Sequence, residues 1–107
     1  MYAKKDDSNF KTPLEGVNFK TLVHGEKTSM HLFHLDKGAK IPTHKHPHEQ
    51  TGYLVSGKMN FTLGDETFLA EPGTSWNIAG DVEHSVDVLE DCVVVEVFAP
   101  VREDYLD

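Results

Sequence analysis

Three histidines and a glutamine follow one another at intervals of two residues in one short segment: His44, His46, His48 and Gln50. Because alternate side chains of an extended chain point to the same face, an unbroken strand would direct all four the same way. Neutral imidazole nitrogens bind Zn, Ni, Fe, Mn, Co and Cu, and an amide oxygen can complete the coordination shell. Pro47 interrupts such a strand, so some of these side chains can converge while another turns aside. The segment predicts a metal site without deciding which of the four are ligands.

A distant histidine strengthens the metal hypothesis. His84 opens another apolar segment, where its side chain could face the same interior as the cluster. The alternative is a solvated polar loop, which is the commoner fate of two closely spaced histidines. His24, His31 and His34 lack a comparable pattern, and we expect them to be structural or surface residues.

A second group of chemically useful side chains lies near the C-terminus. Glu96 interrupts an apolar run and shares its parity with Phe98, so the pattern directs a carboxylate toward the interior. A buried carboxylate either pairs with a cation or takes a raised pKa that suits acid–base catalysis. Arg102 could pair with Glu96 or bind the carboxylate of a substrate. The opposite parity would place Glu96 in solvent, with three valines inward and an ordinary charged tail after them: Val93, Val95 and Val97.

The segments that must position these residues have the pattern of short strands. Stretches rich in β-branched and aromatic residues alternate with turn residues, and no window shows the apolar stripe of a helix. The expected strands are Val17–His24, Ser29–Asp36, Thr51–Ser56, Lys58–Leu63, Thr67–Ala70, Ser75–Ile78, His84–Leu89 and Cys92–Ala99. Met1 to Thr12 is expected to be a polar lead-in or an edge strand. The pattern predicts an all-β sandwich or barrel.

Length and charge limit the partners. A chain of 107 residues is long enough for one domain with a hydrophobic core. Its net charge of -8 argues against a nucleic-acid binder, which needs an excess of Lys and Arg. The single cysteine, Cys92, cannot form an internal disulfide and is expected to be buried. The sequence shows neither a long apolar segment nor a secretory signal, so we expect a cytoplasmic protein that does not span a membrane.

The residues resemble the cupin superfamily over nearly the whole chain. The first cupin motif, G-x5-H-x-H-x3-[E/Q]-x6-G, is met with every spacing kept by Gly38, His44, His46, Gln50 and Gly57. The second motif, G-x5-P-x-G-x2-H, is met by Gly73 and His84, with Ala79 in place of its proline and Asp81 in place of its second glycine. The resemblance implies a double-stranded β-helix (jelly-roll) barrel over residues 1–107, with the motifs in residues 36–99 and a tail in 100–107. It also implies one divalent transition metal ion held by four residues: His44, His46, Gln50 and His84. His48 and Glu49 then fall in a spacer, and small cupins commonly form homodimers.

The C-terminal segment resembles one subgroup of the cupins, the pectin-degradation proteins of the KdgF type. Glu96, Phe98 and Arg102 match its acid-x-Phe-x3-Arg pattern, although the acid in that family is usually aspartate. The resemblance implies conversion of unsaturated monouronates to linear keto forms, with Glu96 and Arg102 catalytic and with Phe98 and Arg102 binding the substrate. Because glutamine is neutral, a divalent ion beside Gln50 keeps its full charge and favours a small anionic ligand bearing a carboxylate. The alternatives are an iron or copper cupin dioxygenase and a non-catalytic cupin that binds a small molecule or a metal.

Overall fold

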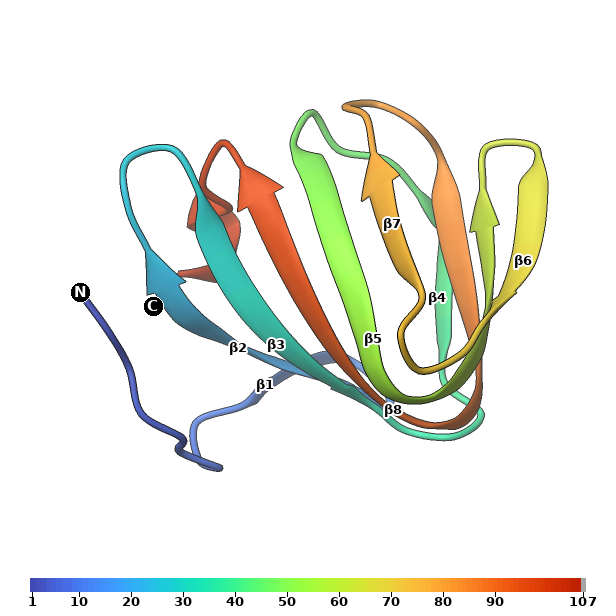
Figure 1. Cartoon of the computed structure of the whole chain (residues 1–107), viewed down its shortest axis with the longest axis horizontal. Coiled ribbons are helices and arrows are strands. Elements are labelled where there is room, and N and C mark those ends of the chain that lie inside the picture. Colours follow the sequence, from blue (N-terminus) through green and yellow to red (C-terminus); the bar gives the residue numbers. More distant parts are fainter. Residues whose placement is uncertain (107) are drawn as a thin grey trace.

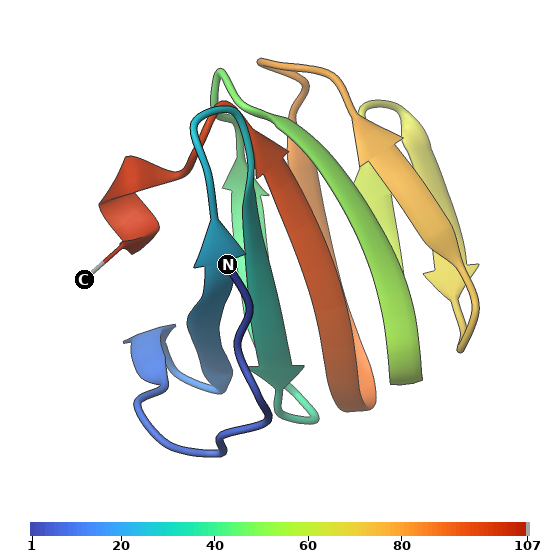
Figure 2. The ribbon, with the colours of Figure 1, turned by 60° about the vertical axis from the view of Figure 1, so that its left-hand side comes forward.

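The protein folds into eight antiparallel strands and one short helical turn, and the computed structural model describes residues 1–106 (Figure 1). The strands are β1 (Lys11–Leu14), β2 (Val17–His24), β3 (Ser29–Leu35), β4 (Lys40–His44), β5 (Glu49–Leu63), β6 (Glu66–Ala70), β7 (Ser75–Ile78) and β8 (His84–Ala99). The helical turn is the 3-10 segment η1 (Glu103–Tyr105), which folds back against β2 and β3 (Figure 2). The predicted all-β class is confirmed, and no helix among residues 1–106 is long and apolar enough to cross a membrane.

Two long strands connect the two halves of the barrel. β5 and β8 pair with each other along nearly their whole length, from Glu49 opposite Ala99 to Leu63 opposite His84. The first half of β5 also pairs with β7 and the second half with β6, whereas β8 pairs first with β4 and then with β3. β5 and β8 therefore curve from one sheet into the other, and the interior lies between the two halves (Figure 1).

The sequence divides each long strand into two, and the structure corrects this division. The stretches expected as separate strands on either side of Gly57 form one strand, β5, and those on either side of Glu90 form β8. The β5–β8 register shifts around residues 54–59, so the strands bend there without ending. Gly57 has a φ of 95°, a conformation that side-chain-bearing residues rarely adopt, and this explains why its position reads as a turn in the sequence.

Two of the short strands have too little apolar pattern to be recognised. β4, which was not predicted, is mostly exposed, and its polar side chains show no alternation. β1 begins where the expected lead-in ends, and residues 1–10 themselves form no strand. Both strands form because a neighbour supplies the hydrogen bonds, β8 for β4 and β2 for β1.

The inward face of β8 determines which residues reach the interior. Its buried positions alternate and include Val94, Glu96 and Phe98, whereas Val93, Val95 and Val97 lie on the outer face and are half-buried. Of the two parities left open by the sequence, the one that directs Glu96 inward is present. Cys92 is buried on the same face, as predicted, and its thiol donates to the backbone carbonyl of Glu90 at 3.1 Å.

Replacing Gly57 by alanine is expected to destabilise the fold more than the same change at Gly73. Both glycines have a positive φ (95° and 96°), but a Cβ at Gly57 would collide with the backbone of Asp91, whereas one at Gly73 meets open space. Both variants carry a backbone penalty of about 1–2 kcal/mol. The collision should lower the free energy of unfolding of the Gly57 variant by at least ~1 kcal/mol more, as urea denaturation measures it. Equal losses in the two variants would contradict the packing described for the bend.

Candidate metal centre and its cavity

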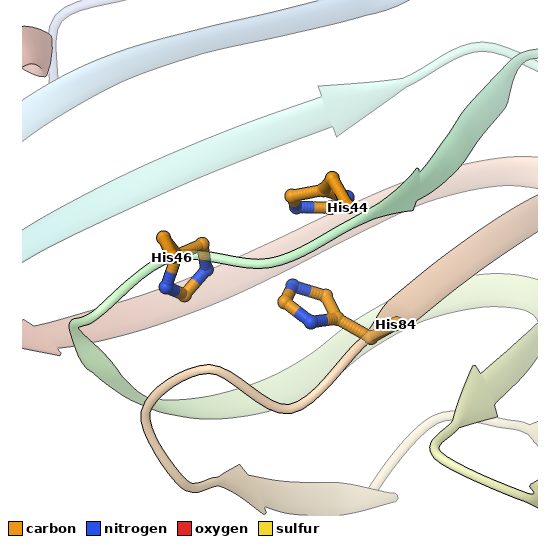
Figure 3. A group of neighbouring side chains, drawn as sticks. All are labelled: His44, His46 and His84. Carbon is orange, nitrogen blue, oxygen red and sulfur yellow. The ribbon is translucent and has the colours of Figure 1, made fainter.

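Three histidines from two segments of the chain meet, with His84 buried, His46 half-buried and His44 exposed. His44 ends β4, His46 lies in the loop before β5, and His84 is the first residue of β8 (Figure 3). Pairing of β4 with β8 places His44 directly opposite His84. One ligand nitrogen from each ring lies within 4.8 Å of the others, so these three predicted residues are brought together.

A backbone carbonyl two residues away orients each ring. The acceptors of the Nδ1–H groups are the carbonyl oxygens of Pro42 for His44 (2.9 Å), His48 for His46 (3.0 Å) and Val82 for His84 (2.9 Å). Since a carbonyl only accepts hydrogen bonds, Nδ1 carries the proton in all three rings and the Nε2 lone pair is left for another partner. Such an outer hydrogen bond is typical of metal-binding histidines.

The unsatisfied nitrogen of His84 tests whether these residues fit a metal ion. Its Nε2 is buried and has no hydrogen-bond partner among residues 1–106. Burial lowers the pKa of His84 to about 4, so the ring is neutral at pH 7 and offers a lone pair. Burial and the charge of Arg102 also lower the pKa of His46. Three converging imidazoles, one of them with a buried nitrogen that has no partner, fit a divalent transition metal, and this set of donors is compatible with several such metals.

Gln50 lies next to this cluster and also fits a cation. It is only 7% exposed, and its Oε1 lies 3.0 Å from Nε2 of His46. With Nδ1 of His46 protonated, both of these atoms are acceptors, and their contact is favourable only with a positive charge between them. Gln50 also acts as a donor that lowers the pKa of Glu96, which agrees with an amide nitrogen toward that carboxyl group and an oxygen toward His46.

Glu96 is a carboxyl group held in an apolar interior beside the cluster. It is 5% exposed, and Trp76 donates its Nε1–H to the two carboxyl oxygens at 3.2 and 3.4 Å. Burial raises the pKa of Glu96 to about 8, although the hydrogen bonds from Gln50 and Trp76 oppose the shift. Gly52 lies opposite, and a Cβ there would overlap the indole and the carboxyl group. Glu96 is therefore largely protonated at pH 7 and can both give and take a proton near neutrality.

Arg102 is a buried cation near the same cluster, and its charge contributes to the lowered pKa of His46. Its guanidinium lies over the rings of Phe98 and Tyr105, with its central carbon 4.8 and 3.8 Å from their centroids. The fork pairs with Asp104, through Nε at 3.0 Å and Nη2 at 2.8 Å, and not with Glu96 as one of the sequence alternatives had it. These two bonds use two of the five guanidinium N–H groups and fix the plane of the group.

A cavity of about 280 Å³ joins these groups. The polar residues that line it are His44, His46, Gln50, His84, Glu96 and Arg102, and much of the remaining wall is apolar. His48 contributes its carbonyl to His46, and Glu49 accepts a hydrogen bond from Asn77 at the surface, so both lie outside the three-histidine cluster. A concave apolar site with a few convergent polar groups is the usual form of a small-molecule site.

Sequence reasoning missed three residues around this cavity. Trp76 lies in an expected strand, but nothing in its pattern indicates that it contacts a carboxyl group across the sheet. Asp104 and Tyr105 belong to the expected tail, which instead folds over the end of the barrel and places Tyr105 in the cavity wall. The only signal for them was their closeness to Arg102 in the chain.

Comparisons with known proteins agree with this geometry. The family model described as "Cupin domain" matches residues 31–98. KdgF from Halomonas sp. superimposes with a TM-score of 0.93 at 27% identity, covering 99% of this chain and 100% of that one. An RmlC-like cupin from Shewanella frigidimarina has a TM-score of 0.92 at 21% identity, with 98% and 95% covered. An oxalate decarboxylase variant from Bacillus subtilis has a TM-score of 0.75 at 22% identity, with 88% of this chain and 28% of that chain covered.

No curated protein sequence matches the chain. The family match nevertheless extends over more than half of the chain, from β3 to the end of β8, and includes all three clustered histidines. The chain belongs to the cupin domain family, and its structure is that of a small KdgF-like cupin.

Proposed function

We propose that the protein is a metal-dependent enzyme that isomerises small carboxylated sugars, converting unsaturated monouronates to linear keto acids. One observation carries the proposal: a single cavity contains three converging histidine donors, a buried carboxyl group with a raised pKa of about 8 and an arginine. The similarity to KdgF from Halomonas sp. supports the same chemistry. The proposal includes a single domain over residues 1–107 and the homodimer that the resemblance implies.

A few residues of the cavity have distinct roles in the proposed reaction. His44, His46, His84 and Gln50 would hold a divalent ion, which supplies Lewis-acid polarisation of a substrate oxygen. Arg102 binds the substrate carboxylate through N–H groups that Asp104 does not use, and the ring of Phe98 forms the wall beneath it. Glu96 is the group that moves the proton.

The reaction is an isomerisation that breaks one carbon–oxygen bond and transfers protons. Ring opening of a 4,5-unsaturated uronate removes the proton of the hydroxyl on C1 and breaks the bond from C1 to the ring oxygen. The resulting enol becomes a ketone at C5 when C4 gains a proton, so no atom is gained or lost overall. A single acid–base residue with a pKa near neutrality can perform both transfers, and Glu96 has such a pKa of about 8.

The neutral Gln50 explains why such a site would accept an anion. None of the four proposed ligands carries a formal charge, so a divalent ion among them retains its full positive charge. The net charge of -8 opposes an anionic ligand at long range. That opposition is screened over about 8 Å at physiological salt, whereas Arg102 and the metal site act at contact distance.

Protein purified without a histidine tag is expected to contain close to one transition metal ion per chain, as measured by elemental analysis. His84→Ala and His46→Ala each remove one lone pair from the cluster, and metal affinity should fall by at least about tenfold. His24→Ala is the matched control, since His24 is exposed at the end of β2 and outside the cluster. Full metal content in the His84 and His46 variants would refute this metal site.

Glu96→Gln is expected to reduce turnover of 4,5-unsaturated galacturonate by at least ~100-fold, because it removes the proton-transferring group. Loss of the enol-ether absorbance measures turnover, and metal content should not change. Glu90→Gln makes the same change at an exposed position of β8 and should leave the rate unaltered. If metal-loaded wild-type protein does not accelerate the reaction, the uronate assignment is wrong. If wild type binds galacturonate without turning it over, and Glu96→Gln binds it with the same affinity, the protein is instead a binding protein.

Gln50→Glu is expected to weaken anion binding while metal still binds. The substitution places a negative charge beside the ion, and a unit charge about 4 Å from another is worth about 4 kcal/mol at an effective dielectric constant of about 20. Calorimetric titration should show galacturonate affinity falling by at least about tenfold relative to the affinity for neutral galactose. An unchanged ratio between the two sugars would show that the neutral amide does not set the preference for anions.

A further inference from the structure

A chain of hydrogen-bonded side chains lies beside the cavity, apart from the metal centre. At its middle is His31, which is 0% exposed and was expected from the sequence to be only structural or superficial. Its Nδ1 lies 3.0 Å from Oγ1 of Thr21, and its Nε2 lies 2.8 Å from Oγ of Ser29. We call these three residues the Thr21–His31–Ser29 chain.

Both ends of this chain meet the C-terminal turn. The backbone N–H of Arg102 donates to Oγ of Ser29 at 3.0 Å, and Oγ1 of Thr21 donates to the carbonyl oxygen of Tyr105 at 3.3 Å. The chain therefore connects the residue before η1 to the last residue of η1. It passes through strands β2 and β3, which are far from the turn in sequence (Figure 2).

The direction of every hydrogen bond in the chain follows from its two ends. The carbonyl of Tyr105 can only accept, so the single hydroxyl proton of Thr21 is used there and Thr21 must accept from Nδ1–H of His31. The neutral ring then presents a lone pair at Nε2, to which the hydroxyl of Ser29 donates. Ser29 in turn accepts from the N–H of Arg102, which can only donate. Each member is satisfied, and only one tautomer of His31 fits.

The surroundings of His31 preserve this neutral state. Burial lowers its pKa to about 4, with a further contribution from the charge of Arg102. The rings of Phe19, Phe98 and Tyr105 lie against the imidazole, at centroid distances of 6.4, 5.4 and 5.3 Å. An apolar side chain of similar size could fill this space, so packing alone does not explain a histidine here.

The turn is short, and its bonds to β2 and β3 fix its position against the barrel. η1 has three residues, and none of them is fully buried. A 3-10 segment of this length has weak hydrogen-bond geometry of its own. Yet Arg102 and Tyr105 form part of the cavity wall, and the guanidinium lies 3.8 Å from the Tyr105 ring centroid. Lys11 adds one more bond to the carbonyl of Tyr105, at 3.0 Å.

We infer that His31 is a positioning residue: through Thr21 and Ser29 it holds Arg102 and Tyr105 against the cavity and thereby sets the affinity for an anionic ligand. His31 does not line the cavity itself, so it acts through the two residues that do. The effect on a ligand rests on the proposed function, in which Arg102 binds a carboxylate. The anchoring of the turn does not rest on it.

The test compares His31→Leu, which fills the space without polar atoms, with His31→Gln, whose amide can donate to Thr21 and accept from Ser29. His34→Leu is the matched control, because His34 lies on the same strand and outside the chain. Hydrogen exchange of the Arg102 amide reports the anchoring, with the Leu54 amide, which bonds the carbonyl of Thr74, as a core reference. Metal content and galacturonate affinity are measured on the same samples.

His31→Leu should speed hydrogen exchange of the Arg102 amide by at least about tenfold, because Ser29, which accepts from that amide, loses its hydrogen bond to His31. Exchange of the Leu54 amide and the metal content should not change. Galacturonate affinity should fall about tenfold, the value of one well-placed charge-assisted hydrogen bond, and His31→Gln should restore most of both effects. Unaltered protection of Arg102 in His31→Leu, or a glutamine variant no better than leucine, would overturn the inference. If wild type binds no uronate, the proposed function fails and exchange at Arg102 alone decides the anchoring.

Thr21→Val provides a second, nearly isosteric test if the leucine variant does not fold. It removes the acceptor of the Nδ1–H group and leaves Ser29 in place. Nitrogen NMR of the His31 ring should show the Nδ1–H tautomer alone in wild type and a shift toward the Nε2–H tautomer in Thr21→Val. A wild-type ring protonated at Nε2, or a valine variant with the wild-type tautomer, would contradict the hydrogen-bond directions inferred for the Thr21–His31–Ser29 chain.

Discussion

The antiparallel pairing of β5 with β8 is the interaction on which the rest of the structure depends. Its register places Gln50 opposite Phe98, Gly52 opposite Glu96 and Leu63 opposite His84. One ladder thus positions a proposed ligand, the buried carboxyl group and a clustered histidine. A slip by one residue would turn each of these side chains to the other face of the sheet. The bend near Gly57 is part of the same constraint, because it lets the two strands serve both halves of the barrel without ending.

The interior concentrates polar groups at one end and keeps almost all of them neutral. Burial lowers the pKa of His84 to about 4 and also lowers that of His46, Gln50 has no charge, and the raised pKa of Glu96 favours its protonated form. Arg102 is the exception, and Asp104 balances it from the surface. An interior without a net negative charge lets a cation enter and keep its field. Trp76 fits the same arrangement, because its N–H donates a hydrogen bond to the Glu96 carboxyl group without adding a charge.

The sequence was informative where spacing or alternation controls the outcome. The expected strands Val17–His24 and Ser75–Ile78 match the structure to the residue. The motif spacing predicted that His84 lies near His44 and His46, as the structure shows. The sequence failed where a partner strand supplies what the local pattern lacks, as in β4, and where a glycine bend looks like a turn. Parity left Glu96 with two orientations, because both faces of β8 are apolar. No local pattern could place Asp104 and Tyr105, since their position depends on contacts with Ser29 and Thr21 in distant strands.

The bonds from the three histidines to their own backbone have a consequence for how the site is loaded. Each acceptor carbonyl lies two residues from the ring that it orients, so the rings are aimed by local chain geometry rather than by an ion. A centre built in this way does not have to be organised by its metal, in contrast to small domains that fold only when loaded. The proposed site would therefore exchange one ion for another without refolding of the barrel. Because several transition metals suit this set of donors, the metals available around the protein would then decide which ion is bound.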